Sequence, residues 1–117
     1  MKGGQKKLIL RFRAVDIDGF NEIKNGLKTV ETRAATPRYK NVQKGDILVI
    51  VCGNERIAKE IKRTRHFKTI EEMLKSISLK KIMPSVKSVA DARKIYYGYA
   101  GYKEKIKKFG LMAFELK

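Results

Sequence analysis

The longest uninterrupted apolar run in the chain, Ile47–Cys52, restricts what the protein can fold into. The run is far shorter than the roughly 18 to 20 residues that a membrane-spanning helix needs. A short segment that is apolar at every position is typical of a central strand covered on both sides. No charged segment followed by an apolar one opens the chain. We therefore predict a folded cytoplasmic protein that is neither secreted nor inserted in a membrane.

The length of 117 residues allows one compact domain with one core. Apolar residues make up 43% of the chain, which argues against disorder. Residues 1–5 are expected to be flexible. A single cysteine, Cys52, and a single histidine, His66, provide neither an internal disulfide nor a zinc cluster. We expect one domain over residues 1–117, without a metal or another cofactor, as a monomer or a weak oligomer.

The charge balance points to a polyanionic partner. Lysine and arginine number 28 against 12 aspartate and glutamate residues, which gives a net charge of +16. A nucleic acid would relieve the resulting self-repulsion, because basic side chains displace the counterions condensed on its phosphates. The alternative is a charged surface of the kind enriched in proteins from hot environments, but there glutamate rises together with lysine. Nucleic acid is therefore the expected partner, and composition alone leaves RNA, DNA and an anionic membrane surface open.

Apolar spacing divides the chain into strands and helices. Strands are expected at residues 7–13, 29–33, 47–52, 56–67 and 111–116. Helices are expected to start at Asp18, at Thr69 with a Thr-x-x-Glu capping box, and at Ser88, with a last helical turn over 103–108. One helix between the first two strands, with further helices later, predicts an α+β domain built on a curled, largely antiparallel sheet.

The faces of the first helix and of the following strand can also be predicted. Helical spacing places Phe20, Ile23 and Leu27 on the buried face of the helix that starts at Asp18. Alternation in the next strand puts Val30 on one face and three polar residues on the other: Thr29, Glu31 and Arg33. This strand therefore carries a polar face directly after a helix end.

The residues of this region resemble a known family. The stretch Gly26-Leu27-Lys28-Thr29-Val30-Glu31-Thr32-Arg33, followed by Lys44-Gly45-Asp46-Ile47, is similar to the signature of the ASCH domain, within the PUA-like superfamily. The segment 67–74, the tyrosine-rich helix and the strand that follows Gly110 stand in family order, so the resemblance covers nearly all of the chain. It implies a PUA-like pseudo-β-barrel of about five to six mostly antiparallel strands with three or four peripheral helices. It also implies a cleft, beside the strand that Lys28 and Thr29 open, that binds RNA or its components.

One bacterial branch that the chain resembles more loosely is an amidohydrolase acting on N4-acetylcytidine. The catalytic lysine of that branch falls on Lys28, whereas the position of its catalytic threonine is Glu31 here. Its helical glutamate has no counterpart, because Lys80, Lys81 and Pro84 occupy that region. The main expectation is a non-enzymatic domain that binds RNA or nucleotides. The alternative is a hydrolase acting on an N4-acetylcytidine-type amide or on RNA, with Lys28 and Glu31 as the catalytic pair.

The strand of the signature carries the central candidate residues. Lys28, Glu31 and Arg33 are expected to converge at the mouth of the cleft, where the acid would hold the lysine. The alternative is an exposed ion pair worth at most about 1 kcal/mol. Arg33 would donate a pair of hydrogen bonds to a phosphate or a base edge, or it would only form an ion pair with Glu31.

Further candidates lie outside that strand. Arg38 and Tyr39 combine a cation with an aromatic face, the pairing that single-stranded nucleic acid binding uses. Tyr96 and Tyr99 have core spacing, which leaves Tyr97 free to stack on a base. A dense cationic stretch on the strand 56–67 would form a groove wall for phosphates or a solvated face. The expected nucleic-acid-binding residues are Lys28, Thr29, Arg33, Arg38, Tyr39, Lys62, Arg63, Arg65 and Tyr97.

Overall fold

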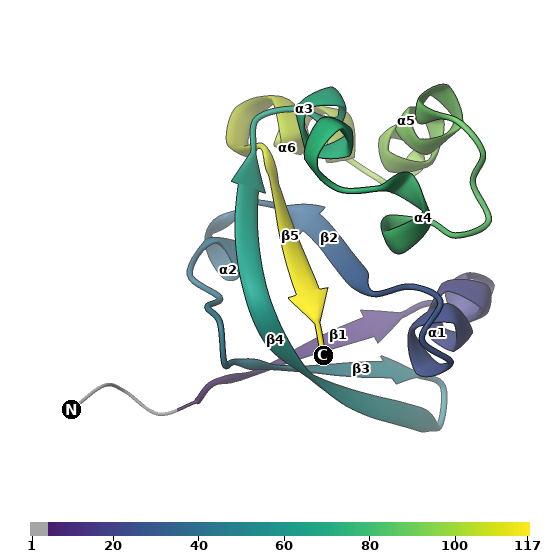
Figure 1. The fold of residues 1–117 in the computed structure, drawn as a ribbon, viewed down its shortest axis with the longest axis vertical. Helices are drawn as coiled ribbons and strands as arrows, with labels where there is room; N and C mark the ends of the chain where they lie inside the picture. The colour runs from purple at the N-terminus through teal and green to yellow at the C-terminus, as the bar shows by residue number, and fades with distance from the viewer. Residues whose placement is uncertain (1–4) are drawn as a thin grey trace.

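The computed structural model describes residues 5–117 as a curled, mostly antiparallel sheet with helices around it (Figure 1). Of the expected flexible start, residues 1–5, all but Gln5 lie outside the described residues. Within the described part, five strands form one sheet in the order β1-β3-β4-β5-β2. The strands are β1 (Lys7–Phe12), β2 (Val30–Ala34), β3 (Ile47–Cys52), β4 (Glu55–Phe67) and β5 (Leu111–Leu116). Only β1 and β3 pair in parallel, which confirms the α+β half-barrel.

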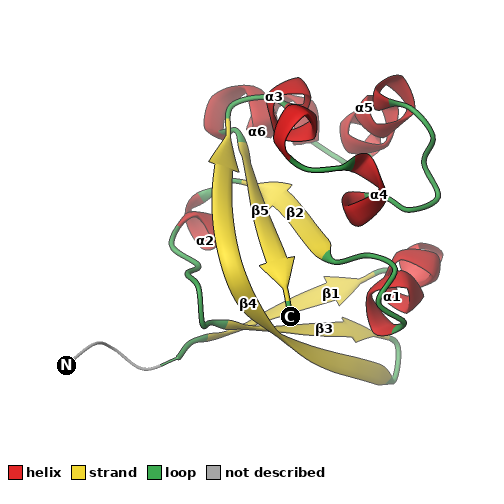
Figure 2. Ribbon diagram, in the orientation of Figure 1, coloured by secondary structure: helices red, strands yellow, loops and turns green. Residues whose placement is uncertain are grey.

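The helices lie around the curled sheet. They are α1 (Ile17–Lys24), α2 (Pro37–Lys40), α3 (Ile70–Ser76), α4 (Leu79–Ile82), α5 (Val89–Gly98) and α6 (Tyr102–Phe109), with a 3₁₀ turn η1 (Ala14–Asp16) before α1. Figure 2 shows α3, α5 and α6 above β2, β4 and β5, with α1 beside the ends of β1 and β3. The four longer helices match the expected number, and α2 and α4 add one turn each. In the region that the structure describes, none of these helices has the length and apolar character to cross a membrane.

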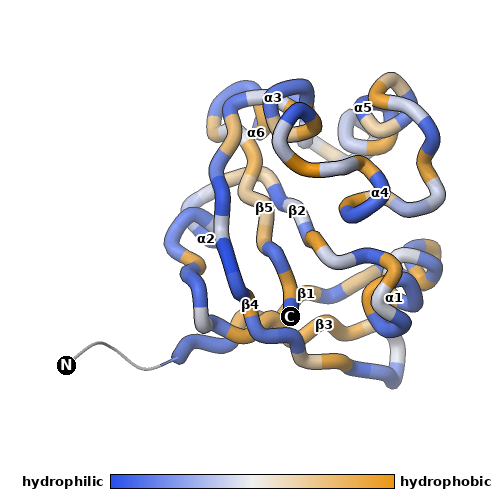
Figure 3. Tube along the Cα trace, viewed as in Figure 1, coloured by the Kyte–Doolittle hydropathy of each residue, from blue (hydrophilic) through white to orange (hydrophobic). Residues whose placement is uncertain are grey.

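Two hydrophobic cores lie on opposite faces of β5. The inner core fills the curl of the sheet and includes Phe20 of α1, Ile50 of β3 and Phe114 of β5. The outer core lies between the sheet and the helices and includes Met73 of α3 and Leu111 of β5. β5 is therefore buried on both faces, although alternation predicts only its inner face as buried. Figure 3 shows the contrast with β4, which is hydrophilic along its middle.

Two expectations about burial are wrong. The outer face of β3 is only half-buried, because the second layer of helices packs on β2, β4 and β5 instead. Leu27 is 62% exposed, since α1 ends at Lys24 and the residue lies beyond the helical face. The N-cap of α1 is Asp16 and not Asp18, which lies in the first turn.

Both predicted helix caps after β4 are confirmed. The Thr69 hydroxyl accepts a hydrogen bond from the Glu72 amide at 3.0 Å, and the Ser88 hydroxyl accepts one from the Asp91 amide at 3.1 Å. These bonds satisfy amides at the helix N-termini that have no partner within the helix. They fix where α3 and α5 begin, and α5 covers the site described next.

Candidate ligand-binding site

A cavity of about 490 Å³ opens between β1 and β2, the two edge strands of the sheet. β1 and β2 do not pair with each other, so the curled sheet is open between them, and we call this opening the seam. The link from α4 to α5 covers the seam. The lining side chains come from β1 and η1, from β2, and from the α4–α5 region: among them are Arg11, Phe12, Arg13, Lys28, Glu31, Thr32, Arg33, Ile82, Met83, Tyr96 and Tyr99. With Asp16, Asp18 and Glu22 also in the lining, the cavity combines cations, acids, hydroxyls and an apolar wall.

The turn before β2 delivers Lys28 to the cavity. Gly26 has a φ of +84°, a left-handed conformation that suits glycine and reverses the chain after α1. The Lys28 amide then donates to the Glu22 carbonyl at 2.9 Å, and the Thr29 amide donates to the Lys81 carbonyl at 3.0 Å. These bonds fix the start of β2 against α1 and α4, with Lys28 held at the cavity.

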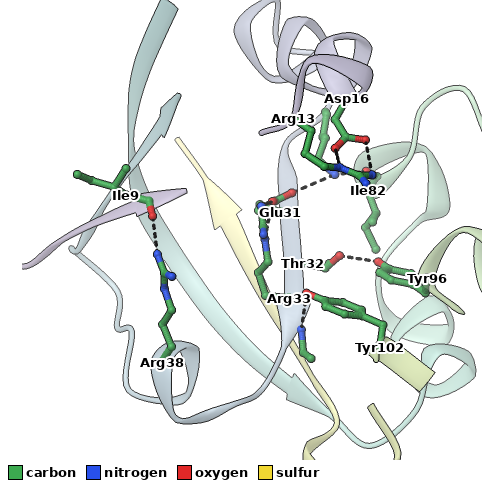
Figure 4. Close-up of polar contacts among 12 residues, drawn as sticks. Ile9, Arg13, Asp16, Glu31, Thr32, Arg33, Arg38, Ile82, Tyr96 and Tyr102 are labelled. Carbon is green, nitrogen blue, oxygen red and sulfur yellow. Dashed lines mark hydrogen bonds and ion pairs between the residues drawn. The ribbon is translucent and has the colours of Figure 1, made fainter. Parts of the chain in front are cut away.

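The half-buried Lys28 and Arg33 form one charge cluster around the buried Glu31, drawn in part in Figure 4. Glu31 Oε1 lies 3.2 Å from Lys28 Nζ, and Arg33 donates to Glu31 Oε2 from Nε at 3.0 Å and from Nη2 at 2.9 Å. Lys28 Nζ also donates to the Ile82 carbonyl at 2.6 Å. An ammonium has three N–H donors, so one remains for a ligand. The expected convergence of these three residues is present in the structure.

Glu31 is held as a carboxylate. Its side chain is only 5% exposed, and burial alone would raise its pKa. The charges of Lys28 and Arg33 and the hydrogen bonds from both outweigh that effect, so the pKa of Glu31 lies below its ordinary value. Burial acts to lower the pKa of Arg33, but the charge of Glu31 dominates and raises it. Within this cluster, two cations and one anion therefore face the cavity.

The opposite face of β2 carries a second buried polar contact. The Thr32 and Tyr96 hydroxyl oxygens lie 2.5 Å apart, and Tyr96 is buried on α5 (Figure 4). Burial raises the pKa of Tyr96, so it stays a neutral phenol. The Tyr102 hydroxyl similarly accepts a hydrogen bond from the Ala34 amide at 3.3 Å. These contacts fasten the free edge of β2 to the helices.

Tyr96→Phe is expected to lower the free energy of unfolding by about 1 to 2 kcal/mol, because it removes a buried hydrogen bond and leaves the Thr32 hydroxyl unpaired. Chemical denaturation at neutral pH measures the change. Tyr97→Phe is the matched control: Tyr97 is the next residue on α5 and is 40% exposed, so its loss should be small. Equal losses in the two variants would contradict the role given to the contact.

The main chain of β2 offers hydrogen-bonding groups to the cavity. The Thr29 carbonyl accepts from the Leu116 amide, and the Ala35 amide donates to the Gly110 carbonyl, so odd-numbered residues of this strand bond to β5. By alternation, the amide and carbonyl of Thr32 point away from β5. Thr32 lines the cavity, so a donor and an acceptor lie side by side there.

Arginine and aromatic side chains lie at the cavity as well. The Arg13 guanidinium pairs with Asp16 at 2.9 Å and lies 5.8 Å from the centre of the Tyr99 ring. Arg33 lies 5.6 Å from the ring centre of Phe12, on the facing strand. Such cation–π contacts orient both guanidinium groups, and the contact between Arg33 and Phe12 joins β2 to β1.

The other predicted residues are distributed over three places. Thr29, Lys62, Arg63 and Arg65 line a separate groove of about 200 Å³. Arg38 donates to the Ile9 carbonyl on β1 at 2.7 Å and lies over the ring of Tyr39, which packs against the inner core. Tyr97 is exposed on α5, with Lys103 Nζ 5.7 Å from its ring centre. The structure does not bring these residues into the cavity with Lys28.

Sequence reasoning missed several lining residues. Tyr96 and Tyr99 were predicted as core, and Tyr96 is buried, but both also line the cavity. A buried tyrosine hydroxyl needs a hydrogen-bond partner, and this requirement could have indicated a polar site next to the core. Arg13 and Thr32 carry no such signal, because only the fold brings β1 next to β2.

Comparisons with known proteins agree with this architecture. The family model of the ASCH domain matches residues 18–117. The chain is similar to the crystal structure of hypothetical protein PH0355, with a TM-score of 0.81 and 25% identity over 95% of this chain and 97% of that one. It is also similar to the solution structure of protein PF0455 from Pyrococcus furiosus, with a TM-score of 0.74 and 23% identity over 95% and 96% of the two chains. No curated protein matches the chain in sequence.

Proposed function

Because the chain belongs to the ASCH domain family, whose PUA-like fold is often linked to RNA binding, we propose that it binds RNA or nucleotides through the cavity beside β2. The observation that carries the proposal is the charge cluster of Lys28, Glu31 and Arg33, with Glu31 buried at its centre, in a cavity of about 490 Å³. That volume lies within the range of roughly 300 to 1,000 Å³ found for small-molecule sites. The net charge of +16 supports a phosphate-bearing ligand.

In this proposal each part of the cavity has a task. Lys28 uses its remaining N–H on a polar group of the ligand. The main-chain amide and carbonyl of Thr32 contact a base edge, which presents donors and acceptors side by side. Arg13 and Arg33 lie beside the aromatic rings and contact phosphate or base oxygens. Glu31 keeps the two cations of its cluster in place.

The residues outside the cavity have supporting tasks. Lys62, Arg63, Arg65 and Thr29 would contact phosphates on the other side of β2. Tyr97 is exposed and would stack on an unpaired base. Two other predicted binding residues, Arg38 and Tyr39, would act indirectly. Arg38 holds β1 through its hydrogen bond to a main-chain carbonyl of that strand, and the ring of Tyr39 packs against the guanidinium of Arg33.

A hydrolase is the second candidate, since a half-buried lysine in contact with a buried carboxylate is an arrangement that can move a proton. Lys28 would then act as base or nucleophile on an N-acylated nucleoside or an RNA phosphodiester, with Glu31 as its partner. The lowered pKa of Glu31 weighs against this role, because it makes the carboxylate a weaker base for taking a proton from the Lys28 ammonium. Turnover of N4-acetylcytidine or RNA that disappears in Lys28→Ala would favour the hydrolase over the binding domain.

Lys28→Met is expected to weaken binding of single-stranded RNA about tenfold to hundredfold, because a charged hydrogen bond to the ligand is worth about 1.5 to 3 kcal/mol. Fluorescence anisotropy over a range of salt concentrations measures it. The log of the wild-type affinity should fall linearly with the log of the salt concentration, and Arg63→Ala should reduce the slope by about one.

Lys24→Met is the matched control for this experiment. Lys24 also pairs with a glutamate, Glu55, at 2.6 Å, but it lies on the surface, with its side chain 51% exposed. Both variants lose one positive charge, so only a contact within the cavity makes Lys28→Met the weaker binder. Equal affinities, or no RNA binding by the wild type at low salt, would refute the proposal.

A further inference from the structure

The groove of about 200 Å³ lies on the side of β2 away from the cavity, where β4 and β5 pass the link between α3 and α4. Four cationic side chains line it: Lys62, Arg63, Arg65 and Lys81. The hydroxyl side chains of Thr29, Ser76 and Ser78 line it as well. Its one acidic side chain is Glu115 of β5. The lining is therefore rich in hydrogen-bond donors and strongly positive.

The register of β4 explains why the cations gather there. Arg63 pairs with Glu115 and Arg65 with Ala113, so the two arginines and the acid share one face of the sheet. A register shift between Ile61 and Arg63 places an extra residue, Lys62, at the same point of the strand. A bulge of this kind re-aims a side chain, and such bulges are common beside functional sites.

The two arginines of this groove form ion pairs, but its cationic side chains form no hydrogen bonds in the described part of the chain. Among residues 5–117, no hydrogen bond involves the side chains of Lys62, Arg63, Arg65 or Lys81. Arg63 Nε and Arg65 Nη1 both lie 3.8 Å from the same oxygen, Oε2 of Glu115, which is longer than a hydrogen bond. The carboxylate balances two guanidinium groups without satisfying the donors of either.

We propose that this groove is a phosphate-binding site and that Glu115 occupies the place of the phosphate when no ligand is bound. A phosphate group offers several oxygen acceptors in a geometry that guanidinium forks match, and it would satisfy donors that the single carboxylate only approaches. Glu115 then competes with the ligand and weakens its binding by like-charge repulsion. The source of the phosphate is either the backbone of the RNA, which rests on the proposed function, or a small phosphate compound.

Glu115→Gln tests the inference as a gain of affinity. It is expected to tighten binding of a single-stranded RNA ten-mer, or of pyrophosphate, about threefold to tenfold at low salt. Glu55→Gln is the control, because it removes the same charge from an exposed position at the start of β4. Arg65→Met should weaken binding of the same probe, and thermal unfolding shows whether each variant is folded.

The RNA ten-mer and pyrophosphate together distinguish a failure of this inference from a failure of the proposed function. A gain with RNA supports a backbone phosphate, whereas a gain with pyrophosphate alone supports the groove but places its ligand among small phosphate compounds. If the wild type binds RNA and Lys28→Met weakens it, but Glu115→Gln and Glu55→Gln bind both probes equally, the groove is not the site and the inference fails. Binding of neither probe by any of the folded variants also overturns it.

Discussion

Glu31→Gln is expected to lower the free energy of unfolding by about 3 kcal/mol, because breaking a buried ion pair leaves uncompensated charge in the interior. The variant keeps the shape of the side chain but removes its charge, so the two cations of the cluster face each other without an anion. The side chains of Lys28 and Arg33 are 11% and 22% exposed, so water screens them only in part. Urea unfolding at pH 7 measures the loss.

The same residue gives the protein a defined response to acid. The pKa of Glu31 is lower in the folded state than its ordinary value of 4.5, so below pH 4.5 the unfolded state binds more protons than the folded state. The stability that Glu31 contributes is therefore complete above about pH 4.5 and is lost as the pH falls through the folded-state pKa. The difference in the free energy of unfolding between the wild type and Glu31→Gln should therefore become smaller over that acid range.

Glu71→Gln serves as the control for both measurements. Glu71 also has a lowered pKa, through its hydrogen bond from Arg93, but its side chain is 46% exposed and solvent screens the pair. We expect little change in stability from this variant. A loss as large as that of Glu31→Gln would mean that burial of the cluster is not what makes Glu31 important.

The parts of the fold that follow from local patterns could be predicted from the sequence. Alternation located the strands to within one or two residues, and the spacing of Thr69 and Ser88 from their partners gave two helix starts. The convergence of Lys28, Glu31 and Arg33 is also local. A turn at Gly26 followed by a strand puts residues 31 and 33 on one face, within reach of residue 28.

The rest depends on contacts that no local pattern reports. α4 is a single turn with the sequence Leu-Lys-Lys-Ile, too short to show a helical period, yet its last carbonyl accepts from Lys28. The sequence predicts a groove wall from the cations of β4 but does not place it relative to Lys28, and Lys62, Arg63 and Arg65 face the other side of β2. The separation results from the register of β4 against β5 and its irregularity at Lys62, which only the paired strands reveal.

Gly110→Ala is expected to lower the free energy of unfolding by about 3 to 5 kcal/mol, which combines backbone strain with overpacking. Gly110 has a φ of +79° and a ψ of −159°, a conformation available almost only to glycine. A Cβ there would lie 2.8 Å from His66 Nε2 and closer still to the Phe67 carbonyl oxygen. Urea unfolding measures the loss, and circular dichroism shows whether the variant folds.

Alanine variants at two other glycines separate the cost of backbone strain from the cost of the steric clash. Gly45 and Gly53 have φ values of +93° and +58°, but an added Cβ would meet no atom within 4 Å at either position. Their alanine variants should lose only about 1 to 2 kcal/mol, the cost of the left-handed conformation. If all three alanine variants lose the same free energy of unfolding, the close approach of β4 to Gly110 does not limit which side chain the position can hold. A larger loss at Gly110 links its packing to the site, because the Gly110 carbonyl accepts from the Ala35 amide and so holds the end of β2 against β5.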